Sequence, residues 1–538
     1  MVDFLSKTRF EPQANFQFKM SADDFTAMVD MGSNEFIQKV SDFIETFQTE
    51  QLERLKELKR YYLADNNIKY RETNRDRDRA DNRIASDWAK YITVFMQGYM
   101  LGNPVEYEGD DNVVEKIDEF AKQNTVDYHD GLLETDLSIY GRAYELVYSN
   151  ADAQERVTKL EPEQTFVVYD DTIAQNSLFG VRFYQIKFSA TNIESYVEVY
   201  TTDTIYYYRS KSSVFSDVQK TNEQPHQFGA VPINEYKNNE ERLGDYESVL
   251  DSIDAYDLSQ SELANFQQDM NDAYLVLIGN PVTGTTEPEY VLDANGDPIL
   301  DDNGQPIPSE NSSADVFRDM RRARMLIMDN NNDPDGPKPD AFYLTKSYDT
   351  AGVEAYKTRL VDDILRFTFT PDTNDQNFAG VQSGEAMKYK LMGNDNLRKT
   401  KERLMTRGIM RRLRLLGNVW GIKSSVSASN PQDGLYNAIN DIQVKFTPNM
   451  PTSDEERIVE LKALYGVVSD ETLFTLLSTF TGVDADEEMK RLESEKQASV
   501  LDFQAQTGYP QLAPDNGNAN GWWLLEETHA RHHGLAGC

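Results

Sequence analysis

LGDYESVLDSIDAYDLSQSELANFQQDMNDA, residues 243–273, is the most unusual stretch of this 538-residue chain. It contains eight acidic residues and no Lys or Arg. Apolar residues, among them Val249, Ile253 and Leu263, recur at helical spacing, which predicts a helix with one apolar face. Such a helix would be roughly 46 Å long. No cation within it offsets the charge, so its acidic residues form either an ordinary solvated face or a functional surface; they include Asp251, Asp254, Asp257 and Glu262.

The residues that follow lead out to an insert and back through a second helix. Short strands are predicted at 274–278 and 342–345, and a helix at 350–366. The turn-rich insert 281–313 holds a near-repeat, LDANGDPI at 292–299 and LDDNGQPI at 300–307, whose Asn-Gly steps favour tight turns. A basic cluster comes after it: Arg318, Arg321, Arg322 and Arg324.

A polar segment, 367–382, follows the second helix without periodicity. We interpret it as a loop that is unusually long for a compact domain, and such loops commonly carry function. Ser383 then caps a long helix, predicted to run to about Leu416, whose second half is basic. Short helices are expected at 452–495, and a loose tail at 496–538.

The first 242 residues combine two patterns of apolar residues. Helical spacing of apolar residues dominates the first 120, and runs rich in Tyr, Val, Ile and Phe between 137 and 236 recur about every ten residues. Such spacing is typical of an antiparallel sheet. The fold class predicted for the chain is therefore α+β.

Composition limits the possible functions. The chain has 54 Lys+Arg against 91 Asp+Glu, a formal net charge of -37, which argues against broad coating of nucleic acid or of an anionic membrane. The single cysteine, Cys538, excludes an internal disulfide framework. No stretch of about 20 apolar residues is present, so no membrane partner is expected.

Catalytic and cofactor motifs are also missing. The sequence has neither a phosphate-binding glycine loop nor an HExxH helix, and three of its five histidines lie in the tail. The segment from Asp293 fails as a calcium loop because its glycine stands fourth instead of sixth. We therefore predict no enzyme activity, no cofactor and no metal site.

The order of the elements indicates a channel. If several copies formed a ring, the two helices would make a tube with the insert at its end. Acidic walls would repel a polyanion evenly and let it slide.

Four segments carry a resemblance to a known family. They are AKYI (89–92) with GYMLGNPV (98–105), DLSIYGRAYE (136–145), PEQTFVVYDD (162–171) and SGEAMKYKL (383–391). On these segments, over roughly residues 40 to 480, the chain resembles the portal proteins of tailed double-stranded DNA bacteriophages, of the type found in long-tailed phages of Gram-positive hosts.

The resemblance implies a portal-type subunit of four parts: an α/β wing, a long-helix stem, a small α/β clip and a helical crown. The wing would be 1–242 together with 383–450, the stem 243–273 and 350–366, the clip 274–345, and the crown 452–495. The loop 367–382 matches the place of the family's tunnel loop. The insert 281–313 looks longer than expected for such a clip.

The resemblance also implies roles for residues. Asp372, Asn374, Gln376 and Asn377 would touch DNA in the channel, unless they form a merely solvated loop. The four clip arginines would meet partner proteins or phosphates, unless they make intersubunit ion pairs. Basic residues of the long helix are expected to pair with acidic residues of neighbouring subunits: Arg407, Arg411, Arg412 and Arg414.

The implied assembly is a ring, usually dodecameric, at one capsid vertex of the virion, assembled in the host cytoplasm. It would pass double-stranded DNA during packaging and ejection. Its protein partners would be the terminase packaging motor, head-tail connector or adaptor proteins, and the major capsid and scaffolding proteins. Two alternatives remain open: another ring-forming phage connector or tail component, and a glycoside hydrolase using paired carboxylates.

Overall fold

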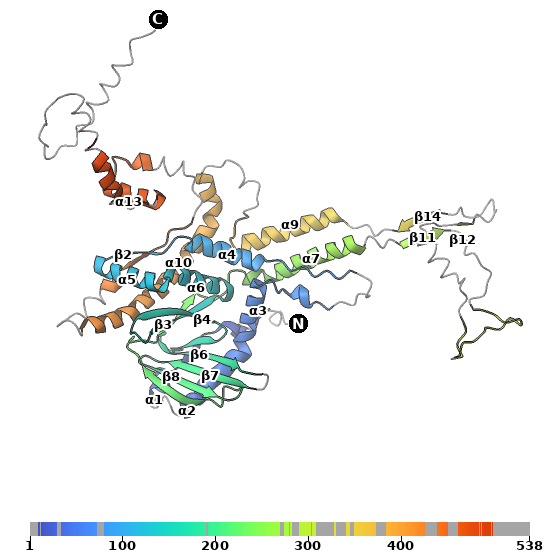
Figure 1. The fold of residues 1–538 in the computed structure, drawn as a ribbon, viewed down its shortest axis with the longest axis horizontal. Helices are drawn as coiled ribbons and strands as arrows, with labels where there is room; N and C mark the ends of the chain where they lie inside the picture. The colour runs from blue at the N-terminus through green and yellow to red at the C-terminus, as the bar shows by residue number, and fades with distance from the viewer. Residues whose placement is uncertain are drawn as a thin grey trace, which may run out of the picture. The chain divides into compact units, whose positions relative to one another are not determined.

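The computed structural model describes residues 9–10, 12–28, 34–72, 80–189, 192–269, 274–278, 280–281, 290–302, 304–307, 328–329, 340–344, 349–372, 384–425, 438–449 and 461–481, and then 483, 485, 487–495 and 498. The chain divides into two compact units, Met1–Met450 and Pro451–Cys538. The fold is of the mixed α+β class, as predicted (Figure 1). None of the described helices is both long and apolar enough to cross a bilayer.

The larger sheet of the first unit has six strands in the order β1-β5-β6-β7-β8-β9. β1 runs parallel to β5, and the other neighbours are antiparallel. The strands are β1 (Phe18–Met20), β5 (Thr165–Asp170), β6 (Ser177–Lys187), β7 (Ile193–Tyr200), β8 (Thr204–Ser210) and β9 (Gln219–Pro225). The predicted antiparallel sheet is confirmed, but β9 was not predicted, because its sequence QKTNEQP is polar and exposed throughout.

The N-terminal helices cover this sheet with an aromatic core. They are α1 (Ala22–Ala27), α2 (Asn34–Thr46) and α3 (Leu52–Tyr62), and a π-helical turn, η3 (Phe47–Gln51), joins the last two. Phe47 stacks on Phe166 of β5 with ring centroids 5.5 Å apart. Phe36 of α2 meets Phe179 of β6 edge to face, also at 5.5 Å. These rings bury the apolar face of α2 and fix it on the sheet.

A second core lies between a three-stranded sheet and a group of helices. The sheet order is β10-β3-β4, with β10 (Ile233–Lys237), β3 (Arg142–Ser149) and β4 (Glu155–Leu160). The helices are α4 (Trp88–Leu101), α5 (Asp111–Asn124), α6 (Val126–Tyr140) and α10 (Gly384–Ser425). A two-stranded pair, β2 (Glu106–Glu108) with β15 (Gln443–Lys445), completes this region. α10 continues past the predicted Leu416 because Leu416 and Val419 extend its buried face.

The two helices predicted to form a stem, α7 (Leu250–Asp269) and α9 (Thr350–Phe367), pack against each other (Figure 1). Strand β11 (Tyr274–Ile278) follows α7 in sequence and pairs antiparallel with β14 (Asp340–Leu344), which precedes α9. A further short pair joins β12 (Asn280–Pro281) to β13 (Met328–Asp329). The order helix, strand, insert, strand, helix is therefore as predicted.

The helix predicted to start at residue 243 begins later. A single 3-10 turn, η5 (Glu247–Val249), precedes α7. Residues before it are held against the end of α6, where the Asp245 N–H donates to the Ser138 carbonyl at 2.8 Å. A Cβ on Gly244 would lie 2.5 Å from the Ile139 carbonyl oxygen, so this close approach requires glycine.

The insert contains two stacked turns that follow the near-repeat. Asp293 Oδ1 accepts the N–H groups of Asn295 and Asp297, and Asp301 Oδ1 accepts the Gln305 N–H. Gly296 and Gly304 have φ of 91° and 79°, the left-handed conformation that these turns need. Three backbone bonds connect equivalent positions of the repeat: Val291 N–H to Ile307, Ile307 N–H to Ile299, and Ile299 N–H to Val291.

In the second unit the described helix α13 (Asp470–Thr481) lies within the predicted crown. Residues 461–464 and 487–495 are also helical. Residues 452–460 of the predicted crown lie outside the described residues.

Two helical glycines offer a matched test of the second core. A Cβ on Gly408 of α10 would lie 2.2 Å from the Tyr236 ring, which is buried, whereas a Cβ on Gly98 of α4 meets no atom within 4 Å. We expect Gly408→Ala to destabilise the protein by about 1–3 kcal/mol through overpacking. Gly98→Ala should instead stabilise it by about 0.5–1 kcal/mol.

Thermal unfolding followed by circular dichroism would compare the two variants with the parent chain. Opposite shifts in melting temperature are expected, and equal shifts would contradict the close packing of α10 on Tyr236.

Candidate functional site

The four acidic residues predicted on the first stem helix all contact the N-terminal part of the chain. Asp254 accepts hydrogen bonds from the Tyr61 hydroxyl at 2.5 Å and from Arg9 at 3.1 Å. Arg9 also reaches Asp251, at 2.8 Å. The cations that offset the charge of α7 thus come from a segment more than 180 residues earlier, and not from within the helix.

The other two acidic residues anchor the segment that precedes α4. Asp257 is fully buried and accepts hydrogen bonds from Asn66 Nδ2 at 2.6 Å and from the Ser86 backbone at 2.9 Å. Glu262 forms an ion pair with Arg71 at 2.6 Å. The interpretation of these four residues as an open acidic wall is wrong for Asp257, because its carboxylate is enclosed by protein. Only Asp251, with 89% of its side chain exposed, is largely open to solvent.

The second stem helix is the more exposed of the two. Its buried residues are Leu360, Ile364 and Leu365, which lie near its C-terminal end. Tyr356 is 49% exposed. Lys357 instead lies toward α7, with Nζ 5.9 Å from the centre of the Tyr256 ring.

The start of the predicted tunnel loop is fixed to the body of the first unit. After α9 the chain turns at Phe369, whose φ is 56°, and the Thr370 N–H donates to the Leu365 carbonyl at 2.9 Å. Asn394 of α10 donates to the Phe369 carbonyl at 3.1 Å, and the Tyr91 hydroxyl of α4 donates to the Pro371 carbonyl at 3.3 Å. Helices α9, α10 and α4 together therefore fix the point at which the loop begins.

Most of the residues predicted to contact DNA or partners cannot be placed. Asp372 lies at the end of the fixed turn. Asn374, Gln376 and Asn377 lie outside the described residues, as do Arg318, Arg321, Arg322 and Arg324.

The basic half of α10 behaves differently from our expectation. Arg412 is buried and forms ion pairs with Asp130 at 2.6 Å and with Glu145 at 2.8 Å. Arg411 donates to the carbonyls of Ile233 and Val231. The prediction that these two arginines pair with neighbouring subunits is therefore wrong, because the contacts of both lie within their own chain.

A second buried ion group joins α10 and α6 to the segment that leads into α7. Lys401, only 2% exposed, lies 2.5 Å from Glu134 of α6 and 2.8 Å from Asp245, which precedes α7. Two residues after Asp245, Glu247 forms an ion pair with Arg54 of α3 at 2.5 Å. Sequence reasoning missed these groups. Helix α6 is buried on nearly every side, and its buried residues include Asp130, Glu134 and Asp136, so apolar periodicity alone gave no signal for them.

The histidines that could have served a catalytic site have structural partners. His129 Nε2 lies 3.0 Å from Glu145 Oε2 in the buried group around Arg412. Burial alone would raise the pKa of the Glu145 carboxyl, but the charge of Arg412 and the His129 hydrogen bond hold that pKa well below its usual range. His226 Nε2 hydrogen-bonds the Thr201 carbonyl at 3.0 Å. Among the described residues, no cluster of His, Cys, Asp or Glu could hold a metal ion.

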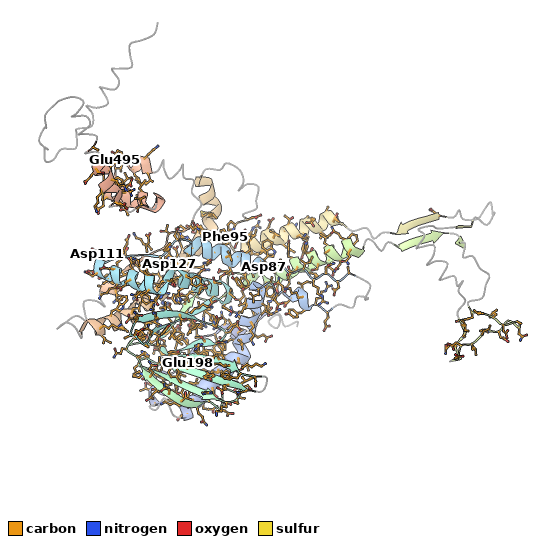
Figure 2. The ribbon with its side chains drawn as sticks, in the orientation of Figure 1. Asp87, Phe95, Asp111, Asp127, Glu198 and Glu495 are labelled. Carbon is orange, nitrogen blue, oxygen red and sulfur yellow. The ribbon has the colours of Figure 1, made fainter. Side chains whose placement is uncertain are left out.

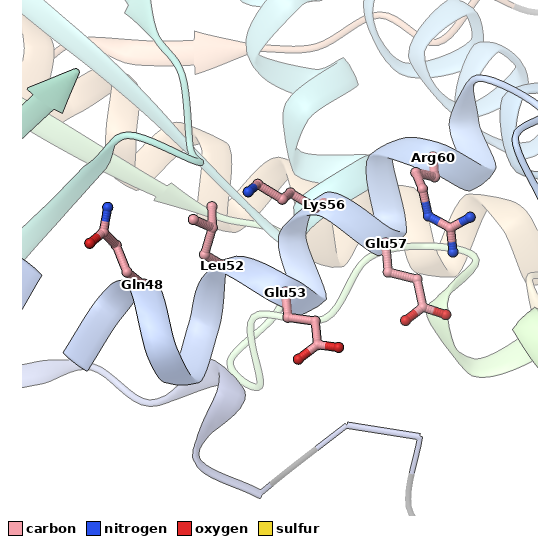
Figure 3. A pocket seen from close by; sticks show the side chains of 6 residues that line it. All are labelled: Gln48, Leu52, Glu53, Lys56, Glu57 and Arg60. Atoms are coloured by element: carbon pink, nitrogen blue, oxygen red, sulfur yellow. The ribbon is translucent and has the colours of Figure 1, made fainter. Parts of the chain in front are cut away.

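A shallow hollow of about 330 Å³ lies over the start of α3 (Figure 3). Its lining comes from one helical face and mixes both charges with little apolar surface, so it does not resemble a small-molecule site. The lining residues are Gln48, Leu52, Glu53, Lys56, Glu57 and Arg60.

Two packed helices with an inserted strand pair, followed by a long helix, are the arrangement that we expect of a portal-type subunit. Comparison with known proteins gives the family: the one described as "Phage portal protein, SPP1 Gp6-like" matches residues 41–500. The chain belongs to this family of phage portal proteins.

A curated relative and a solved structure are similar to the chain. The portal protein of Bacillus phage SPP1 is 28% identical over 267 residues, which cover 44% of this chain and 52% of the relative. The chain thus aligns with about half the length of that relative. A solved structure titled "Neck of empty GTA particle computed with C6 symmetry" matches 78% of this chain and 93% of its own, at 10% identity and a TM-score of 0.37.

Removing the Asp257 carboxylate tests its anchoring role. In Asp257→Ala, the buried Asn66 amide and Ser86 N–H lose their acceptor, which should cost about 1–3 kcal/mol. Asp251→Ala is the matched control on the same helix, and its exposure predicts a change below about 0.5 kcal/mol.

Chemical denaturation of both variants would measure the difference. Equal stability of the two would show that residues 66–86 do not depend on α7.

Proposed function

We propose that this chain forms a closed ring of about a dozen identical subunits at one vertex of a phage capsid, through which double-stranded DNA enters and leaves. The observation that carries the proposal is the family match over residues 41–500, together with the paired helices α7 and α9 and their inserted strands. The curated relative is named as a portal protein, which supports the same role.

The proposed contribution of this chain is mechanical and electrostatic. A subunit with a net charge of -37 repels the DNA backbone, so DNA would slide without sticking. The tunnel loop, with Asp372, Asn374, Gln376 and Asn377, would contact the backbone without reading sequence. For the acidic residues of α7 we propose a supporting role, because they hold this helix on the N-terminal segments.

Partners at the two ends of the ring follow from the same proposal. The clip, with Arg318, Arg321, Arg322 and Arg324, would meet the terminase motor during packaging and the head-tail connector afterwards. Capsid and scaffolding proteins would surround the wing, and DNA would be moved by the motor's catalysis and not by this chain.

The two alternatives are less well supported. A different connector or tail component is disfavoured by the extent of the family match. A glycoside hydrolase needs an accessible acid with a raised pKa. Burial raises the pKa of the Glu134 and Asp136 carboxyls to about 7, but both are enclosed and paired with Lys401 and Lys159.

Light scattering with negative-stain imaging of the purified chain tests the ring. We expect a particle of about a dozen 61.5 kDa subunits with a central hole. A compact dimer without a hole would contradict the conduit.

Substitution of Asp372, Asn374, Gln376 and Asn377 together by Ala tests the tunnel loop. We expect rings to form normally while the amount of DNA packaged into capsids falls strongly, because the channel loses its polar contacts. A matched control replaces Asp217 and Asn222, which are exposed at and before β9, by Ala. Normal packaging by the loop variant would contradict the proposed contact between the tunnel loop and DNA.

A further inference from the structure

One face of α10 presents four exposed cations, two of which make a polar contact within their own chain. Lys399, Arg403, Arg407 and Arg414 are exposed and spaced so that they share one side of the helix. Their positions span 15 residues, or about 22 Å along the axis. Lys399 pairs with Asp395 at 2.7 Å, and Arg414 donates to Asn440 at 2.9 Å.

Arg403 and Arg407 stand out within this face. Within the part of the chain that the structure describes, neither makes a hydrogen bond or an ion pair. Their neighbours Arg411 and Arg412 turn inward and are satisfied there. The helix thus separates its arginines into an inward set, Arg411 and Arg412, and an outward pair, Arg403 and Arg407, that makes no polar contact among the described residues.

Composition favours a protein partner for this face. One side of the helix carries Met392, which is 58% exposed, ahead of the four cations. Methionine and arginine are the residues that protein interfaces enrich relative to the rest of a surface. Nucleic acid is disfavoured because the chain's net charge of -37 repels phosphates and because a channel must release DNA.

An acidic helix of the same chain has matching spacing. On α5, Asp111, Glu115 and Asp118 are exposed and, among the described residues, make no hydrogen bond or ion pair (Figure 2 labels Asp111). The rise from Asp111 to Glu115 equals that from Arg403 to Arg407, about 6 Å. Lys116 and Lys122 are the cations of α5, against five acidic residues between 110 and 119.

We propose that the exposed basic face of α10 docks on the acidic face of α5 of a neighbouring copy of this chain. The proposal rests on the ring put forward above. A closed ring needs a head-to-tail contact between two different faces of each subunit. Here α10 supplies a positively charged face and α5 a negatively charged one. Opposite charges on the two faces would also disfavour contacts between like faces and so set the direction of assembly.

Charge reversal and restoration test this interface in the full-length chain. Arg403→Glu with Arg407→Glu should abolish rings at concentrations where the wild type is assembled, and Asp111→Lys with Glu115→Lys should do the same. Combining all four substitutions should restore rings, because the charges are exchanged. The control is Lys39→Glu with Lys56→Glu, which changes the net charge equally at exposed positions of α2 and α3.

Light scattering and negative-stain imaging would report the rings, and circular dichroism would show that each variant is folded. Rings in both two-residue variants would overturn the interface while leaving the portal function intact. The same holds if the α10 variant forms rings but loses retention of DNA on a filter, which would assign the face to phosphates. A wild-type chain that stays monomeric at all concentrations would contradict the ring and this interface together.

Discussion

The ammonium group of Lys401, enclosed between Glu134 and Asp245, is the contact on which the arrangement of the molecule depends. Three elements meet there: the long helix α10, helix α6, and the segment that leads into α7. A buried charge is costly unless it is paired, so each of the three carboxylate and ammonium groups holds the other two in place. The turn after α9 is also fixed to α10, through Asn394. Helix α10 therefore positions both the segment that leads into α7 and the turn that follows α9.

The ion group around Arg412 also fixes α10 to the second core. It joins α10 to α6 and to strand β3 through Asp130 and Glu145. Together with Arg54 and Glu247, these groups form a polar layer between two apolar cores. Polar layers of this kind tolerate few alternative packings, because a shifted helix would leave a charge unpaired. Rigidity at this level is what a subunit needs if a ring is to bear load.

Much of the fold could be predicted from the sequence because it depends on local periodicity. The alternation of Tyr, Val and Phe located β5 to β8, and helical spacing located α7, α9 and α10. The partners of charged residues could not be predicted, because they are far apart in sequence. Arg9 meets Asp254 across 245 residues, and Arg412 meets Glu145 across 267. Helical spacing does place Arg412 on the side of Ile409 and Leu416, away from Arg407, but it does not identify the carboxylates that Arg412 meets.

The two stacked turns of the insert have a consequence for how this part of the molecule changes over evolution. Each eight-residue repeat supplies its own aspartate, its own left-handed glycine and its own backbone bond to the next repeat. The three backbone bonds close on themselves, because Val291 donates to Ile307, Ile307 to Ile299 and Ile299 to Val291. Deleting or adding one whole repeat would open this cycle, so the two turns are expected to be kept or lost together as one unit.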